Sequence, residues 1–102
     1  MRTTVLIVDD HGGFRESARA LLEAEGFTVV GCAADGAAAL AAVQRLRPEV
    51  VLLDVQLPDL DGFAVAEQLA AVPGPPRVVL ISSRDAAAYG RRLDAKIGRA
   101  HV

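Results

Sequence analysis

Three aspartates stand directly after runs of apolar residues. Asp9 and Asp10 follow the run 5–8, and Asp54 follows the run 50–53. An unbroken apolar run of this length is typical of a strand that is buried on both faces of a parallel sheet. The carboxyl ends of such strands share one edge, where open α/β sheets bind their ligands. If the two strands are neighbours, the three carboxylates converge at that edge.

Carboxylates that converge in this way repel one another. At a separation of about 4 Å and an effective dielectric constant of ~20, one pair repels by roughly 4 kcal/mol. The cluster should therefore take up protons or bind a cation. An oxygen-only set of ligands with an open side suits Mg²⁺. Taken alone, an Asp-Asp pair after a strand is also typical of a helix N-cap, and it is Asp54 that favours the metal site.

Strand and helix patterns alternate along the chain. Strands are predicted at 5–8, 28–33, 50–54 and 78–81. Apolar residues at helical spacing begin at Phe14, after the predicted cap Asp35, after Gly62, and again over about 86–93. Short loops between alternating elements require parallel strands, right-handed crossovers and helices on both faces of the sheet. The sequence therefore predicts a single α/β domain.

Composition narrows the function classes. The net charge of −2 and the scattered arginines argue against direct nucleic acid contact by this segment. No apolar run approaches the ~20 residues of a membrane span, so no membrane contact is expected. The single cysteine, Cys32, cannot form an internal disulfide, and we expect it to be a small buried core residue in a reducing compartment. These features predict a cytoplasmic protein.

With these elements in this order, the chain resembles the receiver domain of two-component response regulators. The resemblance runs from about Thr4 to Leu93. It rests on the acidic pair after the first strand, Asp54 after the third, the loop 57–62 (LPDLDG) and Ser82 after the fourth strand. The stretches 8–11 and 31–36 look closest to the subfamily that carries a helix-turn-helix DNA-binding output domain.

The resemblance implies a flavodoxin-like, doubly wound parallel sheet of order 2-1-3-4-5. It also implies that Asp54 accepts a phosphoryl group from a sensor histidine kinase, and that Mg²⁺ is held by Asp9, Asp10, Asp54 and the backbone carbonyl of Gln56. Ser82 would donate a hydrogen bond to the phosphoryl group. Such a domain is a switch that assists its own phosphorylation and dephosphorylation and controls an output domain or partner protein, with a transcriptional output expected. It is not otherwise an enzyme.

Five other residues receive ordinary structural interpretations. Asp59 and Asp61 are predicted to be turn and cap residues, because Pro58 and Gly62 bracket them. His11 is predicted to be a solvated loop residue without a ligand role. Tyr89 is predicted to pack on the fourth helix, and Ser83 to be a polar residue at a strand end.

The chain departs from the family after the fourth helix. A fifth strand with its lysine, and a fifth helix, would lie past Val102, and Lys96 comes too early to be that lysine. Residues 96–102 also read as a translation of a common sequencing-library adapter. We therefore expect residues 1–95 to be an incomplete receiver domain and 96–102 a non-native tail. Without the fifth strand, 78–81 becomes an open apolar edge that could form a dimer, and Phe14 and Leu21 lose cover.

Three other functions are compatible with parts of the pattern. A degenerate receiver domain that acts only as a protein-interaction module is the main alternative, because the family's lysine is missing. An aspartate-nucleophile phosphatase needs a second acid two residues after the nucleophile, where this chain has Gln56. A dinucleotide-binding unit needs a glycine-rich turn after the first strand, whereas Asp9 and Asp10 place anions there.

Overall fold

The computed structural model describes residues 2–82. Four parallel strands form one sheet in the order β2-β1-β3-β4, which confirms the order that the family resemblance implied. The strands are β1 (Thr4–Val8), β2 (Thr28–Ala33), β3 (Val50–Asp54) and β4 (Arg77–Ile81). The helices are α1 (Gly12–Ala24), α2 (Gly36–Leu46) and α3 (Gly62–Ala70). The predicted helix at 86–93, Ser83, Tyr89 and the tail 96–102 lie outside the described residues.

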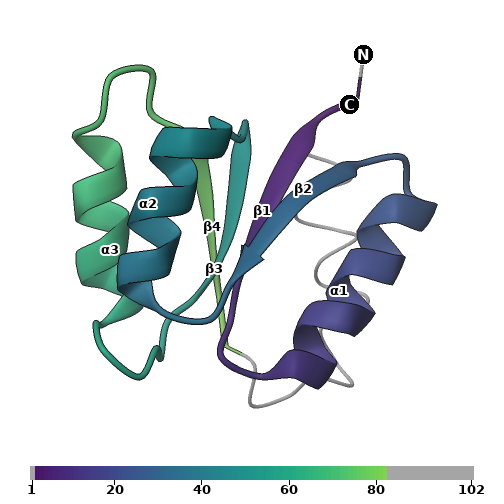
Figure 1. Cartoon of the computed structure of the whole chain (residues 1–102), viewed down its shortest axis with the longest axis horizontal. Helices are drawn as coiled ribbons and strands as arrows, with labels where there is room; N and C mark the ends of the chain where they lie inside the picture. The colour runs from purple at the N-terminus through teal and green to yellow at the C-terminus, as the bar shows by residue number, and fades with distance from the viewer. Residues whose placement is uncertain (1, 83–102) are drawn as a thin grey trace.

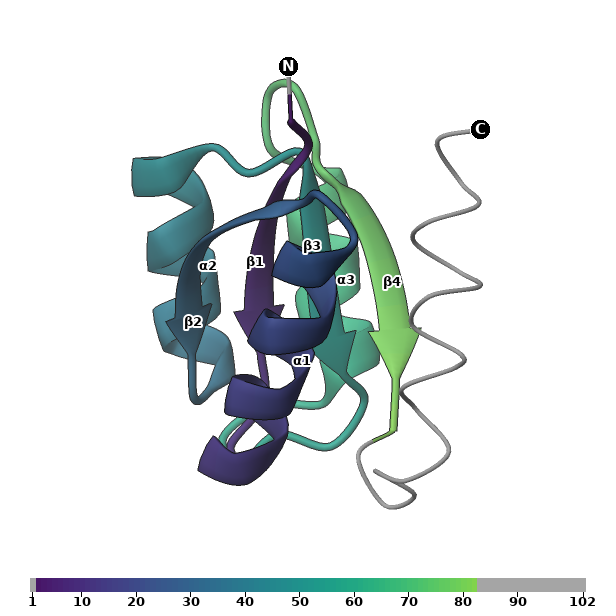
Figure 2. The ribbon, with the colours of Figure 1, turned by 90° about the vertical axis from the view of Figure 1, so that its right-hand side faces the viewer.

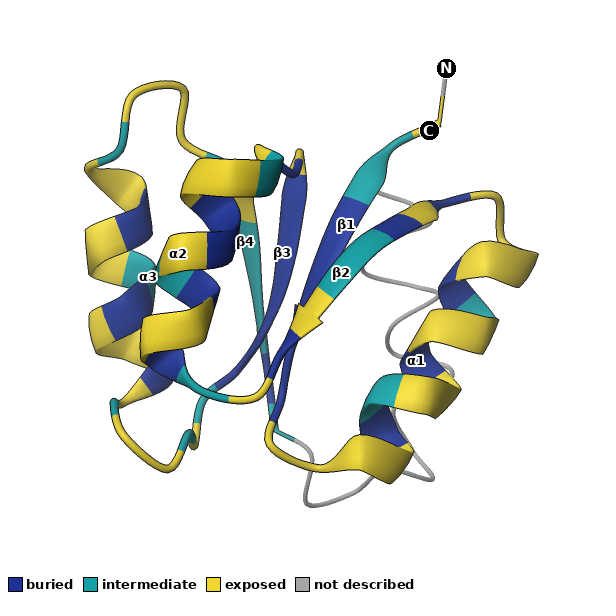
Figure 3. Cartoon of the chain, in the orientation of Figure 1, coloured by how far each residue is buried: buried dark blue, intermediate teal, exposed yellow. Residues whose placement is uncertain are grey.

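The sheet separates two layers of helix. Helix α1 covers one face, and α2 and α3 lie side by side on the other (Figure 1; Figure 2). Successive side chains of a strand point to opposite faces, so Val5 and Ile7 pack towards α1, whereas Leu6 and Val8 pack towards α2 and α3. Strands β1 and β3 are therefore buried on both sides (Figure 3). This burial explains why their sequences are unbroken apolar runs.

Capping residues and residues in the left-handed conformation mark the helix ends close to the positions that the sequence indicated. Asp35 caps α2 by accepting a hydrogen bond from the Ala38 N–H (2.7 Å). Helix α2 ends at Leu46, and its C-cap Arg47 takes a left-handed conformation (φ 51°) before Pro48. Gly26, with φ 95°, follows the end of α1.

The expected burial of Cys32 and the expected exposure of Phe14 are both wrong, whereas Leu21 is half-buried. Cys32 is exposed, because β2 is the outer strand of the sheet and the Cys32 thiol lies beside the exposed Arg19, 3.7 Å from its Nη2. The β1–β2 register also shifts between Val5 and Leu6, which alternation alone did not predict. Phe14 is not left bare: it is 7% exposed, because it packs into the cluster that the α1-facing residues of β1, β3 and β4 form.

Strand β4 is the outer strand on the other side of the described sheet, and β3 is its only strand partner within residues 2–82. Val78, Val79 and Leu80 are half-buried. The dimer that the sequence predicted along this edge stays a prediction. None of the helices in the described part of the chain combines the length and the apolar character needed to cross a bilayer.

The loop between β3 and α3 is closed at both ends by backbone contacts. The Gly62 N–H donates to the Val55 carbonyl (3.0 Å), and Gln56 and Asp61 form an isolated antiparallel bridge. Asp61 caps α3 through the Phe63 N–H (2.7 Å). The Asp59 carboxylate accepts from Gly36 N–H (2.7 Å) and from the N–H of Ala37 (3.0 Å). Both aspartates thus have the structural roles that the sequence indicated.

Asp59 should tie this loop to α2 in a pH-dependent way. The two N–H groups of α2 hold the pKa of the Asp59 carboxyl below its usual value. A depressed pKa contributes stability that is present above the unfolded-state pKa, near 4, and is lost as pH falls through the folded-state value. In Asp59→Asn a single amide oxygen replaces two carboxylate oxygens, so we expect a lower melting temperature than wild type at pH 7.

The measurement is thermal melting of both proteins from pH 7 to pH 3. The difference between them should shrink over the acid end of that range. Glu67→Gln, which removes one exposed charge from α3, is the matched control and should melt like wild type. A difference in melting temperature that stays constant down to pH 3 would contradict the charge-based account.

Candidate functional site

The sheet register brings the aspartates together. Val8 of β1 pairs with Leu53 of β3, so the next residues, Asp9 and Asp54, lie side by side at the carboxyl edge. Asp54 itself pairs with Ile81 of β4. Ser82 follows at the same edge and is half-buried. Strands β1 and β3 are therefore neighbours, and the carboxylates at their ends come together as expected from the sequence.

Asp9 is held rigidly below the surface. Asp9 is 0% exposed. Its backbone N–H donates to the Ala33 carbonyl of β2 (3.0 Å), and its carbonyl accepts from Arg15 Nη1 of α1 (2.6 Å). The carboxylate Oδ1 accepts the His11 N–H (2.8 Å). Contacts from β2, α1 and the β1–α1 loop therefore fix both the backbone and the side chain of Asp9.

Asp54 is equally buried, at 1% exposure. Its Oδ1 accepts the backbone N–H of Gln56 (3.1 Å). The next residue, Val55, donates its N–H to the Ile81 carbonyl of β4 (2.8 Å). The carboxylate at the end of β3 is thus oriented by the start of its own loop, and the backbone beside it is tied to β4.

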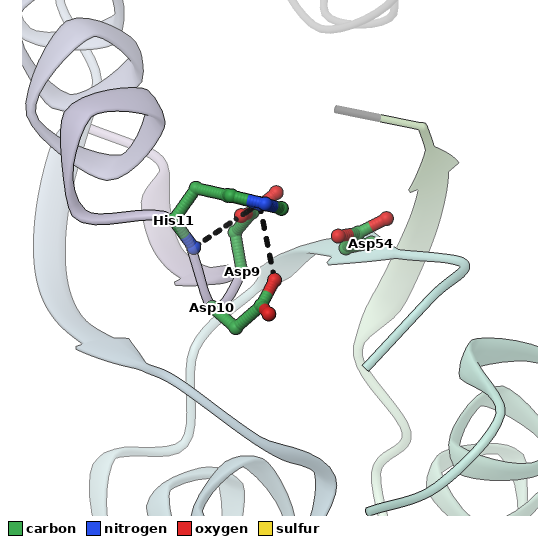
Figure 4. A group of neighbouring side chains, drawn as sticks. All are labelled: Asp9, Asp10, His11 and Asp54. Carbon is green, nitrogen blue, oxygen red and sulfur yellow. Dashed lines mark hydrogen bonds and ion pairs between the residues drawn. The ribbon is translucent and has the colours of Figure 1, made fainter. Parts of the chain in front are cut away.

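Asp10 and His11 complete the cluster at the surface (Figure 4). His11 Nδ1 lies 2.9 Å from Asp9 Oδ1 and 3.1 Å from Asp10 Oδ1. Asp9, Asp10, His11 and Asp54 each offer one ligand atom, and these atoms all lie within 4.8 Å of one another. The hydrogen bond to Asp9 and the charge of Asp10 raise the pKa of His11 above its ordinary value of 6.5.

The donor set fits a divalent cation. Asp9 Oδ2 is buried and has no hydrogen-bond partner among the described residues. A buried carboxylate oxygen without a partner carries a desolvation penalty of several kcal/mol unless a cation or proton compensates for it. The oxygens of three carboxylates are the ligands that Mg²⁺ prefers. Neither member of the acidic pair is the N-cap residue of α1, which is His11.

Comparison with known proteins settles the family. The family model of the response regulator receiver domain matches residues 5–97. The DNA-binding response regulator MtrA of Mycobacterium tuberculosis is 42% identical over an alignment of 87 residues, and the match covers 83% of this chain and 37% of MtrA. The chain belongs to the response regulator receiver domain family.

Two further relatives show the breadth of the receiver family. Protein-glutamate methylesterase/protein-glutamine glutaminase 5 of Myxococcus xanthus is 48% identical over 80 residues, 78% of this chain and 23% of that protein. A CheY-like receiver domain of Methylobacillus flagellatus is similar in structure, with a TM-score of 0.76 at 31% identity, over 83% of this chain and 73% of that one. The chain spans less than half the length of the curated relatives it matches.

Within this receiver domain, the predicted site residues occupy one edge of the sheet. Asp9, Asp10 and Asp54 form one cluster, and the Gln56 backbone lies against Asp54. Ser82 is placed at the carboxyl end of β4, next to the residue that pairs with Asp54. The lysine that is typical of the family is not among residues 2–82, which contain no lysine.

Sequence reasoning missed three contributors to the receiver site. His11 is exposed, as expected, but its ring contacts both members of the acidic pair. Arg15 reaches back from α1 to the Asp9 carbonyl. Gly62 packs so closely on the Asp54 carbonyl that an added Cβ would collide with it. The spacing of residues carries no signal for the contacts of His11 and Arg15, because both contacts depend on side-chain direction. The sequence pattern indicates Gly62 only as a turn residue.

Proposed function

We propose that this receiver domain is the phosphorylation switch of a two-component system. Asp54 accepts the phosphoryl group of a phosphohistidine on a sensor histidine kinase. A carboxylate oxygen attacks the phosphorus, the new P–O bond forms as the P–N bond breaks, and the electron pair returns to the kinase's imidazole nitrogen. The observation that carries this proposal is a buried, oriented Asp54 beside two further carboxylates, one with a buried, unpartnered oxygen.

Asp9, Asp10, Asp54 and the Gln56 carbonyl would hold Mg²⁺. The ion, when bound, offsets the charge that grows on the phosphoryl oxygens during transfer. The Gln56 N–H keeps the attacking carboxylate in one orientation. Ser82, at the carboxyl end of the neighbouring strand, would donate its hydroxyl hydrogen to a phosphoryl oxygen and so draw the β4 end towards Asp54.

The signal leaves the domain through a cytoplasmic output domain or partner protein. We propose a transcriptional output, which the DNA-binding relative MtrA supports. The methylesterase relative shows that receiver domains also occur with enzymatic outputs. The domain itself would contact neither nucleic acid nor membrane. Residues 1–95 would belong to the receiver domain, and residues 96–102 would be a non-native tail.

The test is incubation of the chain with acetyl phosphate and Mg²⁺, followed by intact-protein and peptide mass spectrometry. We expect the gain of one phosphoryl group, on Asp54, and no gain when EDTA is present. Beryllofluoride, a phosphoryl mimic, should also bind only when Mg²⁺ is present. If neither reagent modifies or binds the folded protein, a degenerate, interaction-only receiver domain is the better description.

The substitution Asp10→Ala should weaken Mg²⁺ binding without destabilising the fold. Wild type should gain stability with Mg²⁺ by mass action, by about 2.7 kcal/mol when the ion is present at ~100 times its Kd. In Asp10→Ala one of three carboxylate ligands is gone, so we expect Mg²⁺ affinity to fall at least about tenfold. Stability without metal should be equal or higher, because one repelling charge is removed.

Thermal melts across a Mg²⁺ titration measure both effects. Glu16→Ala, which removes an exposed carboxylate from α1 outside the cluster, is the control and should keep the full Mg²⁺ response. Equal Mg²⁺ responses in wild type and Asp10→Ala would exclude Asp10 as a ligand.

A further inference from the structure

The position of His11 in the cluster suggests more than a solvated loop residue. Its Nδ1 lies between two carboxylate oxygens, 2.9 Å from Asp9 Oδ1 and 3.1 Å from Asp10 Oδ1 (Figure 4). Its backbone is fixed, because the His11 N–H donates to the same Asp9 Oδ1 (2.8 Å). A nitrogen donor is therefore held against the acidic pair from the start of α1.

These spacings match those between adjacent ligands of a six-coordinate metal ion. When metal–ligand bonds are about 2.1 Å long, neighbouring ligands of an octahedron are ~3.0 Å apart. Both N···O distances of His11 lie close to that value. The buried, unpartnered Asp9 Oδ2 independently indicates that the same cluster needs a cation.

We propose that His11 is a nitrogen ligand of this site and that it gives the receiver domain a preference for borderline divalent ions such as Co²⁺ or Ni²⁺. Imidazole suits these ions, whereas Mg²⁺ takes oxygen ligands. The inference rests on the metal site of the proposed function and adds one ligand to it. The cluster is then not an oxygen-only site, although its three carboxylates still bind Mg²⁺.

A different role for His11 makes the opposite prediction. If the ring acts only as a positive counter-charge for Asp9 and Asp10, every divalent ion must compete with it. Removal of the ring would then strengthen the binding of all divalent ions, Mg²⁺ included. If the ring is a ligand, its removal weakens the binding of borderline ions and leaves Mg²⁺ binding unchanged or tighter.

The test compares wild type, His11→Ala and His101→Ala as full-length, untagged chains. Alanine is suitable at position 11 because His11 makes no side-chain cap bond to α1. His101 is the other histidine of the chain and serves as the matched control. Calorimetric titrations with Mg²⁺, Co²⁺ and Ni²⁺ give the affinities. Electron spin echo modulation of bound Mn²⁺ detects a directly coordinated ¹⁴N nucleus.

We expect His11→Ala to weaken Co²⁺ and Ni²⁺ binding at least about tenfold, with Mg²⁺ binding no weaker than in wild type. The ¹⁴N modulation should be present in wild type and in His101→Ala, and absent in His11→Ala. Thermal melts without metal confirm that each variant is folded.

Absence of ¹⁴N modulation in wild type, or equal changes in the affinities of all three ions, would overturn the inference. If at the same time Asp54 still accepts a phosphoryl group with Mg²⁺, the ligand role of His11 fails alone and the proposed function stands. If wild type binds no divalent ion at all, the metal site fails, and the inference with it.

Discussion

Asp54→Asn should abolish phosphoryl incorporation and leave the fold intact. The amide has nearly the shape of the carboxylate, and its oxygen can still accept the Gln56 N–H that Asp54 Oδ1 accepts now. It is, however, a poor nucleophile towards phosphorus. Because the change also removes one of three repelling charges, the variant without metal should melt at the same temperature as wild type or higher.

The measurement is incorporation from acetyl phosphate, by mass spectrometry, with melting followed in parallel. Asp35→Asn is the matched control: it makes the same chemical change at the N-cap of α2, where asparagine caps as well as aspartate. That control should incorporate phosphate like wild type. Phosphoryl transfer to Asp54→Asn at the wild-type level would show that another residue is the acceptor.

Gly62→Ala should be the most damaging small substitution near the site. A Cβ at Gly62 would collide with the Asp54 carbonyl oxygen and lie 2.6 Å from the Val55 Cα, and both are backbone atoms that cannot turn aside. Overpacking typically lowers the free energy of unfolding by ~1–3 kcal/mol. Because backbone atoms cannot turn aside, we expect the loss in Gly62→Ala to reach or exceed the upper end of that range. Against a total stability of ~5–15 kcal/mol, we expect the melting temperature to fall by more than about 10 °C.

The control is Gly13→Ala in the first turn of α1, where nothing lies within 4 Å of an added Cβ. It should melt at the wild-type temperature or slightly above it, since alanine favours helix by up to ~1 kcal/mol. Gly62→Ala should also lower the rate of phosphorylation, because the backbone of Asp54 must shift. If Gly62→Ala melts and reacts like wild type, the backbone of the β3–α3 loop can move to accommodate a Cβ at low cost.

The strands and the acidic residues at their carboxyl ends could be predicted because they depend on features that the sequence carries locally, whereas the strand order was implied by the resemblance to the receiver family. An apolar run that ends in aspartate marks a buried strand and its carboxyl edge, and Asp35 marks the start of α2 by its capping chemistry. Such signals need no knowledge of the neighbours in space. Alternation of strands and helices then leaves few arrangements of the sheet.

What the sequence could not supply depends on neighbours and directions in space. Cys32 lies in an apolar stretch, but its exposure follows from the outer position of β2 and from the shift in register with β1. The buried state of Phe14 depends on how closely α1 packs on the sheet. The contacts of His11 and Arg15 with the acidic pair depend on side-chain rotamers, which spacing does not encode.

The closed loop after β3 has a consequence for how this chain can vary. The Gly62–Val55 hydrogen bond and the Gln56–Asp61 bridge join the two ends of a ring that begins beside Asp54 and ends at the first residue of α3. A ring closed in this way can exchange its exposed side chains but cannot gain or lose a residue without moving Asp54 or α3. The site therefore requires a fixed number of residues between Asp54 and Gly62, in addition to its particular side chains.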